Sequence, residues 1–183
     1  MIRSIGLHWH TDDVFWGKGA QAGSLLGVLA SKKKGTAVDF RDQIAVYVLY
    51  ADFQPIYAGQ VGSGEQRLLA RLKQHRDSDL KGRWNRFSWY GLRSVLKTGK
   101  LSKANAAFHP SRETVLNHVE GILIDAMEPG QNLQSGRFGS DVEWYRQVRS
   151  PLLPLSEEEM LRVLYKAELD RAKVAKKKAA KPK

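Results

Sequence analysis

Two short segments near residue 50 alternate between side chains of different polarity and size, and this alternation constrains the fold more than any other feature. The first segment covers residues 45–50 and the second covers residues 56–61, with Asp52 at the turn between them. Alternation with a period of two predicts strands, and the short connection predicts an antiparallel hairpin. Direct pairing of Tyr47 with Tyr57 would leave a three-residue loop and place both rings on one face of the sheet.

The patterns after this hairpin predict helices and one further strand. Residues 65–77 carry leucines at helical spacing with arginines on the other side, and residues 86–95 are aromatic and β-branched enough for a third strand. A longer helix begins after Pro110 and is stopped by Pro129 and Gly130. Its apolar stripe comprises Val115, Leu116, Val119, Ile122, Leu123, Ala126 and Met127. The chain is therefore predicted to be an α/β (α+β) protein with a small three-stranded antiparallel sheet flanked by helices.

Short polar motifs lie on these elements in a fixed order. The sequences AVY at 45–47 and YAG at 57–59 lie on the two strands, and RLKQH at 71–75 lies on the first helix. The segment 120–132 has the form E-x2-L-I-x4-P-x2-N. Together these motifs resemble those of the GIY-YIG nuclease family over roughly residues 43–133, about half of the chain.

The resemblance implies a GIY-YIG-type endonuclease that hydrolyses phosphodiester bonds of DNA. Such an enzyme uses one Mg²⁺ ion, with Mn²⁺ as an alternative, and water attacks directly to leave a 3′-hydroxyl and a 5′-phosphate. The family's roles fall on six residues of this chain: Tyr47 as general base, Tyr57 as support, Arg71 as phosphate clamp, Glu120 as metal ligand, and His75 and Asn132 as assisting groups.

Elementary chemistry suits these residue types to that reaction. The planar donor fork of Arg71 matches a phosphate, and its four-residue spacing from His75 puts both on one helical face. Glu120 lies at the edge of the apolar stripe, so we expect a half-buried carboxylate, which is costly without a cation partner. Mg²⁺ accepts a single protein carboxylate and leaves its other positions to water and phosphate.

Alternatives remain at several positions. Ala45 stands in place of the family's leading glycine, and Ala58 in place of its usual aliphatic residue. Arg67 has the commoner distance from the second strand motif but lacks a histidine four residues later, so Arg71 is preferred. A lone strand tyrosine or helical glutamate is ordinarily a packing or surface residue. The alternative function is a catalytically inactive nucleic-acid-binding module with the same fold, and the motifs do not separate DNA from RNA.

The charge of the chain favours a polyanionic partner. The net charge is +11, and six lysines from residue 173 onward, without any acid, account for six of these charges and leave +5 for the rest. Release of counterions rewards any basic surface that faces phosphates. Cysteine is absent, which excludes disulfides and thiolate metal sites. Because no segment has the pattern of a signal peptide or a membrane span, we expect a cytoplasmic protein without a membrane partner.

The remaining segments are predicted to be appendages of the nuclease domain (43–133). Residues 1–42 form an N-terminal extension with two short strands, and residues 134–171 form a helical extension with helices from Asp141 and Ser156. Residues 172–183 form a disordered basic tail. Four side chains of types that can bind a metal lie close together in the N-terminal segment: His8, His10, Asp12 and Asp13. We expect a structural role for them rather than metal binding.

Overall fold

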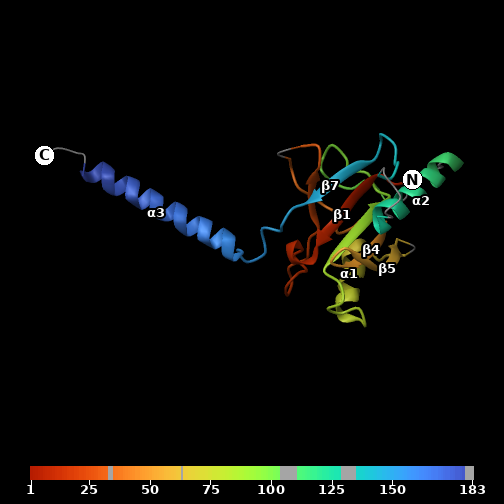
Figure 1. Cartoon of the computed structure of the whole chain (residues 1–183), viewed down its shortest axis with the longest axis horizontal. Coiled ribbons are helices and arrows are strands. Elements are labelled where there is room, and N and C mark those ends of the chain that lie inside the picture. The colour runs from red at the N-terminus through yellow and green to blue at the C-terminus, as the bar shows by residue number, and fades with distance from the viewer. Residues whose placement is uncertain (33–34, 63, 104–110, 129–134, 180–183) are drawn as a thin grey trace. The chain divides into compact units, whose positions relative to one another are not determined.

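The computed structural model describes residues 1–32, 35–62, 64–103, 111–128 and 135–179, with the backbone alone for 174–179 (Figure 1). The chain divides into two compact units, Met1–Ser150 and Pro151–Lys183. The first unit contains the whole sheet and two helices, α1 (Leu68–Asp77) and α2 (Arg112–Met127). The second unit contains α3 (Glu157–Ala179).

The described residues form one seven-stranded sheet in the order β3-β2-β7-β1-β6-β4-β5. Only the β1–β7 pair is parallel among the described pairs, so the sheet is mixed. Its strands are β1 (Ser4–His10), β2 (Leu26–Leu29), β3 (Val38–Asp39), β4 (Ala45–Ala51), β5 (Gln54–Val61), β6 (Arg86–Gly91) and β7 (Glu143–Gln147).

The α+β class is confirmed, but the prediction of a small three-stranded sheet is wrong. The three predicted strands are present as β5, β4 and β6 at one edge of the sheet. The other side of β6 pairs with β1, where Ile5 lies opposite Tyr90, and four strands from outside the motif region extend the sheet. In a three-stranded sheet β6 would be a buried edge strand with unpaired backbone groups, and pairing with β1 satisfies these groups.

The helix predicted from Asp141 is also wrong, because residues 143–147 form strand β7. Strand β7 lies between β1 and β2, and Trp144 pairs with Ile5 of β1. Adjacent aromatic residues such as Trp144 and Tyr145 favour a pleated, half-buried strand over a helix. The pairing with β1 is long-range, so local helical spacing could not reveal it.

The hairpin has a different register from the predicted one. Tyr47 pairs with Gly59 and Tyr57 pairs with Leu49, so the direct Tyr47–Tyr57 pairing and the three-residue loop are wrong. A register irregularity after Leu49 leaves a two-residue turn at Asp52 and Phe53, with φ +55° at Asp52. The two tyrosines are offset by two positions rather than one. They therefore still share a face of the sheet, as predicted.

The two faces of the sheet carry separate cores. The face that bears Tyr47, called the Tyr47 face below, packs Leu49 and Trp89 with Leu68 and Leu72 of α1. On the opposite face, Val48 and Tyr50 pack with Ala126 of α2. Because consecutive strand residues point to opposite sides, α1 and α2 cover opposite faces of the β4 region. The serine that precedes α2, Ser111, caps it by accepting the Thr114 amide at 3.1 Å.

Helix α3 begins at a reciprocal cap and runs further than expected. The Ser156 amide donates to the Glu159 carboxylate at 2.8 Å, and the Glu159 amide donates to the Ser156 hydroxyl at 3.2 Å. The helix continues past Lys173, where it was predicted to end, to Ala179. Alanine and lysine are good helix formers.

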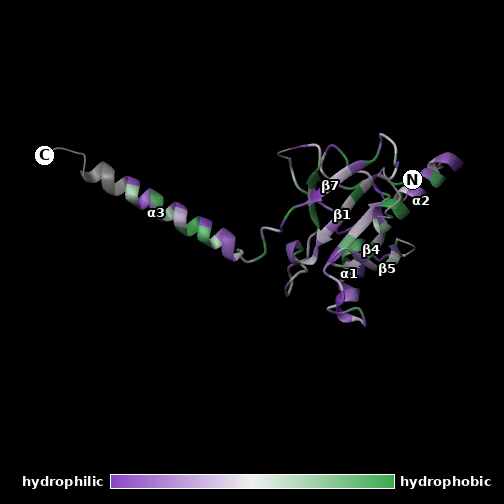
Figure 2. Ribbon diagram, in the orientation of Figure 1, coloured by the Kyte–Doolittle hydropathy of each residue, from purple (hydrophilic) through white to green (hydrophobic). Residues whose placement is uncertain are grey.

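Hydrophobic and hydrophilic residues alternate along α3 (Figure 2). Within the described residues, no helix is both long and apolar enough to cross a bilayer.

Candidate active site

Tyr47 occupies the middle of β4, with Trp89 of β6 on one side and Gly59 of β5 on the other. Its side chain is fully buried. A Cβ atom at position 59 would lie 2.5 Å from the Tyr47 hydroxyl oxygen, closer than any real contact. Glycine is therefore required at 59 because the phenol crosses the β5 backbone at that point. The glycine of the second strand motif thus has a direct steric explanation.

Helix α1 presents two polar side chains to this phenol. Leu68, Leu69 and Leu72 anchor the helix in the core on the Tyr47 face. Arg71 and His75, one turn apart, consequently lie over the sheet. The Tyr47 hydroxyl oxygen is 2.8 Å from Nε2 of His75, and Nε of Arg71 donates to the same oxygen at 3.3 Å.

Tyr57 completes this cluster from β5. Its ring centroid lies 6.2 Å from that of Tyr47 in a stacked arrangement and 4.8 Å from that of His75. Tyr57 is half-buried, whereas Tyr47 and His75 are buried. Four predicted site residues, Tyr47, Tyr57, Arg71 and His75, are therefore in mutual contact. We refer to them as the tyrosine cluster.

Burial and the neighbouring cation set the protonation states of the cluster. Burial raises the pKa of Tyr47, and Tyr57 adds to this rise, while the hydrogen bond from Arg71 opposes it. Burial first, and the Arg71 guanidinium second, lower the pKa of His75. At neutral pH Tyr47 is thus a phenol and His75 a neutral imidazole. When Nδ1 of His75 carries the imidazole proton, the phenol donates to Nε2 and keeps its oxygen lone pairs for Arg71 and for one further donor.

Arg67, the rival of Arg71, lies at the start of α1 and is turned away from the phenol. Its guanidinium donates to the carbonyl oxygens of Gly64 at 2.7 Å and Gln66 at 2.9 Å. Arg71 instead uses Nη1 to reach Gln74 Oε1 at 2.9 Å and Nε to reach Tyr47. The geometry favours Arg71 as the arginine of the cluster.

Glu120 is exposed, not half-buried as expected, and no described contact joins it to the tyrosine cluster. It lines a surface hollow of about 490 Å³ along α2, together with exposed apolar residues such as Leu116, Leu123 and Met127. The predicted apolar stripe is largely turned outward. The face of α2 that packs inward centres instead on Gly121, where the Phe138 ring fits closely against the helix backbone.

A divalent cation shared by Glu120 and Tyr47 does not fit this arrangement. Helix α2 covers the face of the sheet opposite the Tyr47 face. Within the described ranges, no three histidine, aspartate or glutamate side chains come together as a metal site. Asn132, the remaining predicted site residue, lies outside the described residues.

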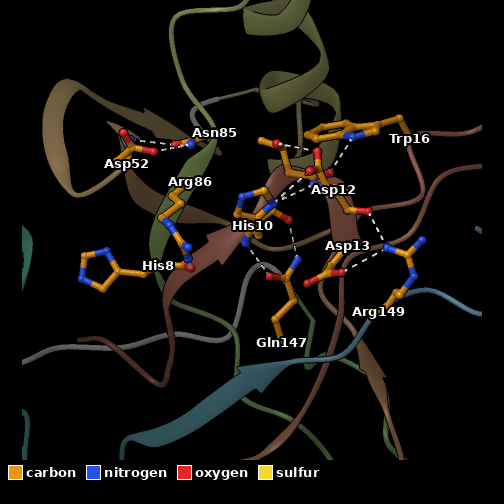
Figure 3. A network of polar contacts seen from close by, with 11 residues as sticks. His8, His10, Asp12, Asp13, Trp16, Asp52, Asn85, Arg86, Gln147 and Arg149 are labelled. Atoms are coloured by element: carbon orange, nitrogen blue, oxygen red, sulfur yellow. Dashed lines mark hydrogen bonds and ion pairs between the residues drawn. The ribbon is translucent and has the colours of Figure 1, made fainter. Parts of the chain in front are cut away.

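The histidines and aspartates of the N-terminal segment form a structural network rather than a metal site (Figure 3). Nδ1 of His10 accepts the Asp12 amide at 3.2 Å, and the Gln147 amide group donates to the His10 carbonyl at 2.8 Å. Arg149 pairs with Asp13 at 3.3 Å. These bonds tie the end of β1 to β7 and to the segment that follows it, which agrees with the structural role favoured by the sequence.

Two parts of the cluster escaped sequence reasoning. The bond between Tyr47 and His75 connects residues from different elements, and no spacing rule foretells it. The steric role of Gly59 depends on the shifted hairpin register.

A scan of protein-family models, a search of curated proteins and a search of solved structures each give no match to the chain.

Proposed function

We propose that the chain is a nuclease that hydrolyses phosphodiester bonds of DNA at the tyrosine cluster. One observation carries the proposal: the Tyr47 hydroxyl lies in hydrogen-bonding contact with a neutral imidazole and with a guanidinium at the same time. Proton acceptance and phosphate binding are the two functions that such a reaction demands of side chains. The motif resemblance points to the same reaction.

The contacts support a proton relay through Tyr47. Its raised pKa makes a resident phenolate a poor starting state for a general base. In the relay, the phenol oxygen takes a proton from the attacking water while its own proton passes to Nε2 of His75. The new bond from water to phosphorus forms as the bond to the 3′-oxygen breaks, and that oxygen takes a proton from solvent. The products are a 5′-phosphate and a 3′-hydroxyl.

Arg71 has the position and the chemistry of a phosphate clamp. Its guanidinium is only partly buried and presents several N–H donors beside the phenol. Charge that develops on the phosphate oxygens during attack would be stabilised by this fixed cation. Because Tyr47 is fully buried, the half-buried Arg71 and Tyr57 side chains must move aside for water and phosphate to reach its hydroxyl.

The catalytic requirement for Mg²⁺, with Glu120 as its ligand, follows from the resemblance alone. A bound divalent cation would neutralise charge on the transferring phosphate. Since Glu120 and the tyrosine cluster lie on opposite sides of the sheet, no step of the relay is routed through such an ion. The side chains that the relay uses are those of Tyr47, His75 and Arg71, and a bound divalent cation would add charge neutralisation at the phosphate.

The same separation favours a second candidate, a nucleic-acid-binding module without catalysis. A binding module needs a basic surface and no metal carboxylate, which suits the separation of Glu120 from the tyrosine cluster. It gives no reason for the Tyr47–His75 bond, and for this observation the nuclease is the better explanation.

Incubation of the purified protein with supercoiled plasmid DNA separates the two candidates. Nicked or linear products with Mg²⁺, absent with EDTA and absent for Tyr47→Phe under both conditions, would support the nuclease. DNA binding in a mobility-shift experiment without any cleavage, with Mg²⁺ or Mn²⁺, would instead support the binding module.

A further inference from the structure

A second hollow lies at the other end of the sheet from the tyrosine cluster. It has a volume of about 470 Å³ and is lined by β2, β3 and β7 residues and by two loops. One loop contributes Lys32 and Thr36 and the other contributes Lys97 and Thr98, while Glu143 and Tyr145 of β7 also line the hollow. Its volume is within the range of small-ligand sites.

The loop that carries Lys97 is held in a defined conformation. Val95 bridges to Leu101, and the Leu96 amide donates to the Lys100 carbonyl at 2.8 Å. Gly99 closes the turn with φ +76°, a value that favours glycine. Nε of Arg93 donates to the Ser102 carbonyl and connects the two ends of the loop. Lys97 therefore lies in the turn of a hydrogen-bonded hairpin and not in an irregular segment.

The lining groups divide into cations at the rim and an acceptor on the sheet. Lys32 and Lys97 are exposed and offer ammonium groups from two separate loops. Tyr145, which is buried, donates to a Glu143 carboxylate oxygen at 2.6 Å. Burial and this carboxylate raise the pKa of Tyr145, so it stays a donor. A carboxylate has lone pairs for further donors after accepting one bond.

A nucleotide combines the groups that this hollow can satisfy. Its phosphate suits the two lysines, and amino or hydroxyl groups of its base or sugar suit the Glu143 carboxylate. A bare phosphate fits less well, because the carboxylate would repel it. A purely apolar ligand would leave the lysines and Glu143 without partners.

The hollow and the tyrosine cluster lie on the same face of the sheet, since Tyr145 and Tyr47 belong to one core. Strands β1 and β6 separate β7 from β4. At about 4.8 Å per strand, the backbones of β7 and β4 are about 14 Å apart across the sheet. Bases stack at about 3.4 Å along a strand of DNA, so this span corresponds to about four nucleotides.

We propose that the hollow lined by Lys32, Lys97 and Glu143 binds a nucleotide unit of the nucleic acid that is cut at the tyrosine cluster. The inference rests on the proposed function for the identity of the strand. The hollow thus positions the substrate at a second point about four nucleotides from the cleavage site. A free mononucleotide has the same chemistry, and the experiment below distinguishes the two sources.

Equilibrium binding of a fluorescein-labelled 20-base-pair duplex in EDTA tests the proposal without cleavage. We expect the double variant Lys32→Gln/Lys97→Gln to bind at least about tenfold more weakly at low salt. The slope of log affinity against log salt should flatten by about 0.9, because both lysines bind the single phosphate of the nucleotide unit. The matched control is Arg112→Gln, an exposed cation on α2, and it should leave the slope unchanged.

Each outcome decides a separate point. A double variant with the affinity and salt slope of the wild type overturns the site. Saturable binding of a deoxynucleoside monophosphate that requires Lys32 and Lys97, with duplex binding unaffected, upholds the nucleotide chemistry but overturns the strand as its source. If the double variant binds the duplex more weakly but the wild type never cleaves DNA, the site is supported and the proposed nuclease activity is refuted. If the wild type cleaves DNA but the double variant binds the duplex as tightly as the wild type, only the site is refuted.

Discussion

The hydroxyl oxygen of Tyr47 lies 2.8 Å from Nε2 of His75, and this bond joins the middle of strand β4 to the last turn of α1. Both side chains are buried, so the surrounding protein shields the bond from water. Both groups are neutral at pH 7, because the pKa of His75 is lowered and that of Tyr47 is raised. In the tautomer of His75 that carries its proton on Nδ1, the phenol is the donor and Nε2 the acceptor, and this is the form that the relay uses.

Removal of the Tyr47 hydroxyl should separate catalysis from folding. Tyr47→Phe keeps the ring in its core position but leaves the buried His75 without this partner, at a cost of about 1–3 kcal/mol in the free energy of unfolding. Turnover of plasmid DNA should fall by about two to four decades, the usual contribution of a proton acceptor. Thermal unfolding and cleavage rates measure the two effects. Tyr165→Phe, on exposed α3, is the matched control and should change neither. Near-normal cleavage by Tyr47→Phe would show that Tyr47 is a packing residue and not the proton acceptor.

The lowered pKa of His75 predicts how activity depends on pH. Protonation of Nε2 removes the acceptor of the relay, so turnover should fall as the pH drops through the pKa of His75 in the folded protein. Because burial and Arg71 lower that value, the midpoint should lie below the ordinary histidine value of about 6.5. His75→Gln, whose amide oxygen can accept the same hydrogen bond but not the proton, should lower turnover at every pH and leave the residual rate without this acid limb. An acid limb that persists in His75→Gln would assign it to another group.

Stability should follow the same histidine in a defined direction. A histidine whose pKa is lower in the folded than in the unfolded state binds protons preferentially when unfolded. The free energy of unfolding should therefore be fully developed above about pH 6.5 and decrease as the pH falls through the folded value. Burial also lowers the pKa of His118, so wild type and His75→Gln must be compared to isolate the His75 contribution.

Substitution of the two arginines tests which of them binds the phosphate. Arg71→Ala should reduce turnover by about two decades or more with a modest loss of DNA affinity, because a clamp acts mainly in the transition state. Arg67→Ala should do much less, since that guanidinium is occupied with backbone carbonyls near the helix start. Single-turnover rates and separate binding curves measure both quantities. The reverse order of effects would make Arg67 the catalytic arginine.

Local patterns of the sequence were sufficient for the motif-bearing elements. The strands around Tyr47 and Tyr57, the helix with Arg71 and His75, and the helix that ends at Met127 all form close to their predicted bounds. Each depends on periodicity or capping within a few residues, which a sequence displays directly.

Long-range contacts account for the features that local patterns missed. The sheet gains β1 and β7 by pairings with distant segments, and the hairpin shifts register through a single irregularity after Leu49. The apolar spacing of α2 did not reveal which of its faces is covered, because Gly121 and Phe138 pack closely where larger residues were expected to be buried. The location of Glu120 was mispredicted for this reason.

The role of Glu120 can be tested without disturbing the fold. Its side chain is exposed, so Glu120→Gln should leave the thermal midpoint unchanged. If Glu120 is the Mg²⁺ ligand that the motif implies, this variant should lose Mg²⁺-dependent cleavage. Glu113→Gln, an exposed carboxylate in the first turn of α2, is the matched control. Cleavage at the wild-type rate by Glu120→Gln would refute the metal assignment and leave the tyrosine cluster as the whole of the site.

A methyl group at position 59 should damage the site by displacing both tyrosine rings, since its Cβ would also lie 2.9 Å from Cε1 of Tyr57. In Gly59→Ala the new Cβ would meet the Tyr47 hydroxyl oxygen at 2.5 Å and its ring carbon Cζ at 2.7 Å. The phenol must shift, and the bond to His75 Nε2 then lengthens or breaks. We expect turnover to fall nearly as far as in Tyr47→Phe, with a stability loss of about 1–3 kcal/mol from local overpacking. The matched control is Gly64→Ala, where a Cβ would meet nothing within 4 Å. The double variant Gly59→Ala/Tyr47→Phe has no hydroxyl to clash, so its loss of stability should be smaller than the sum of the two single losses, although the contact with ring carbon Cζ remains. Additive losses would show that the hydroxyl oxygen contributes little to the clash, and the explanation of Gly59 by this oxygen would then fail.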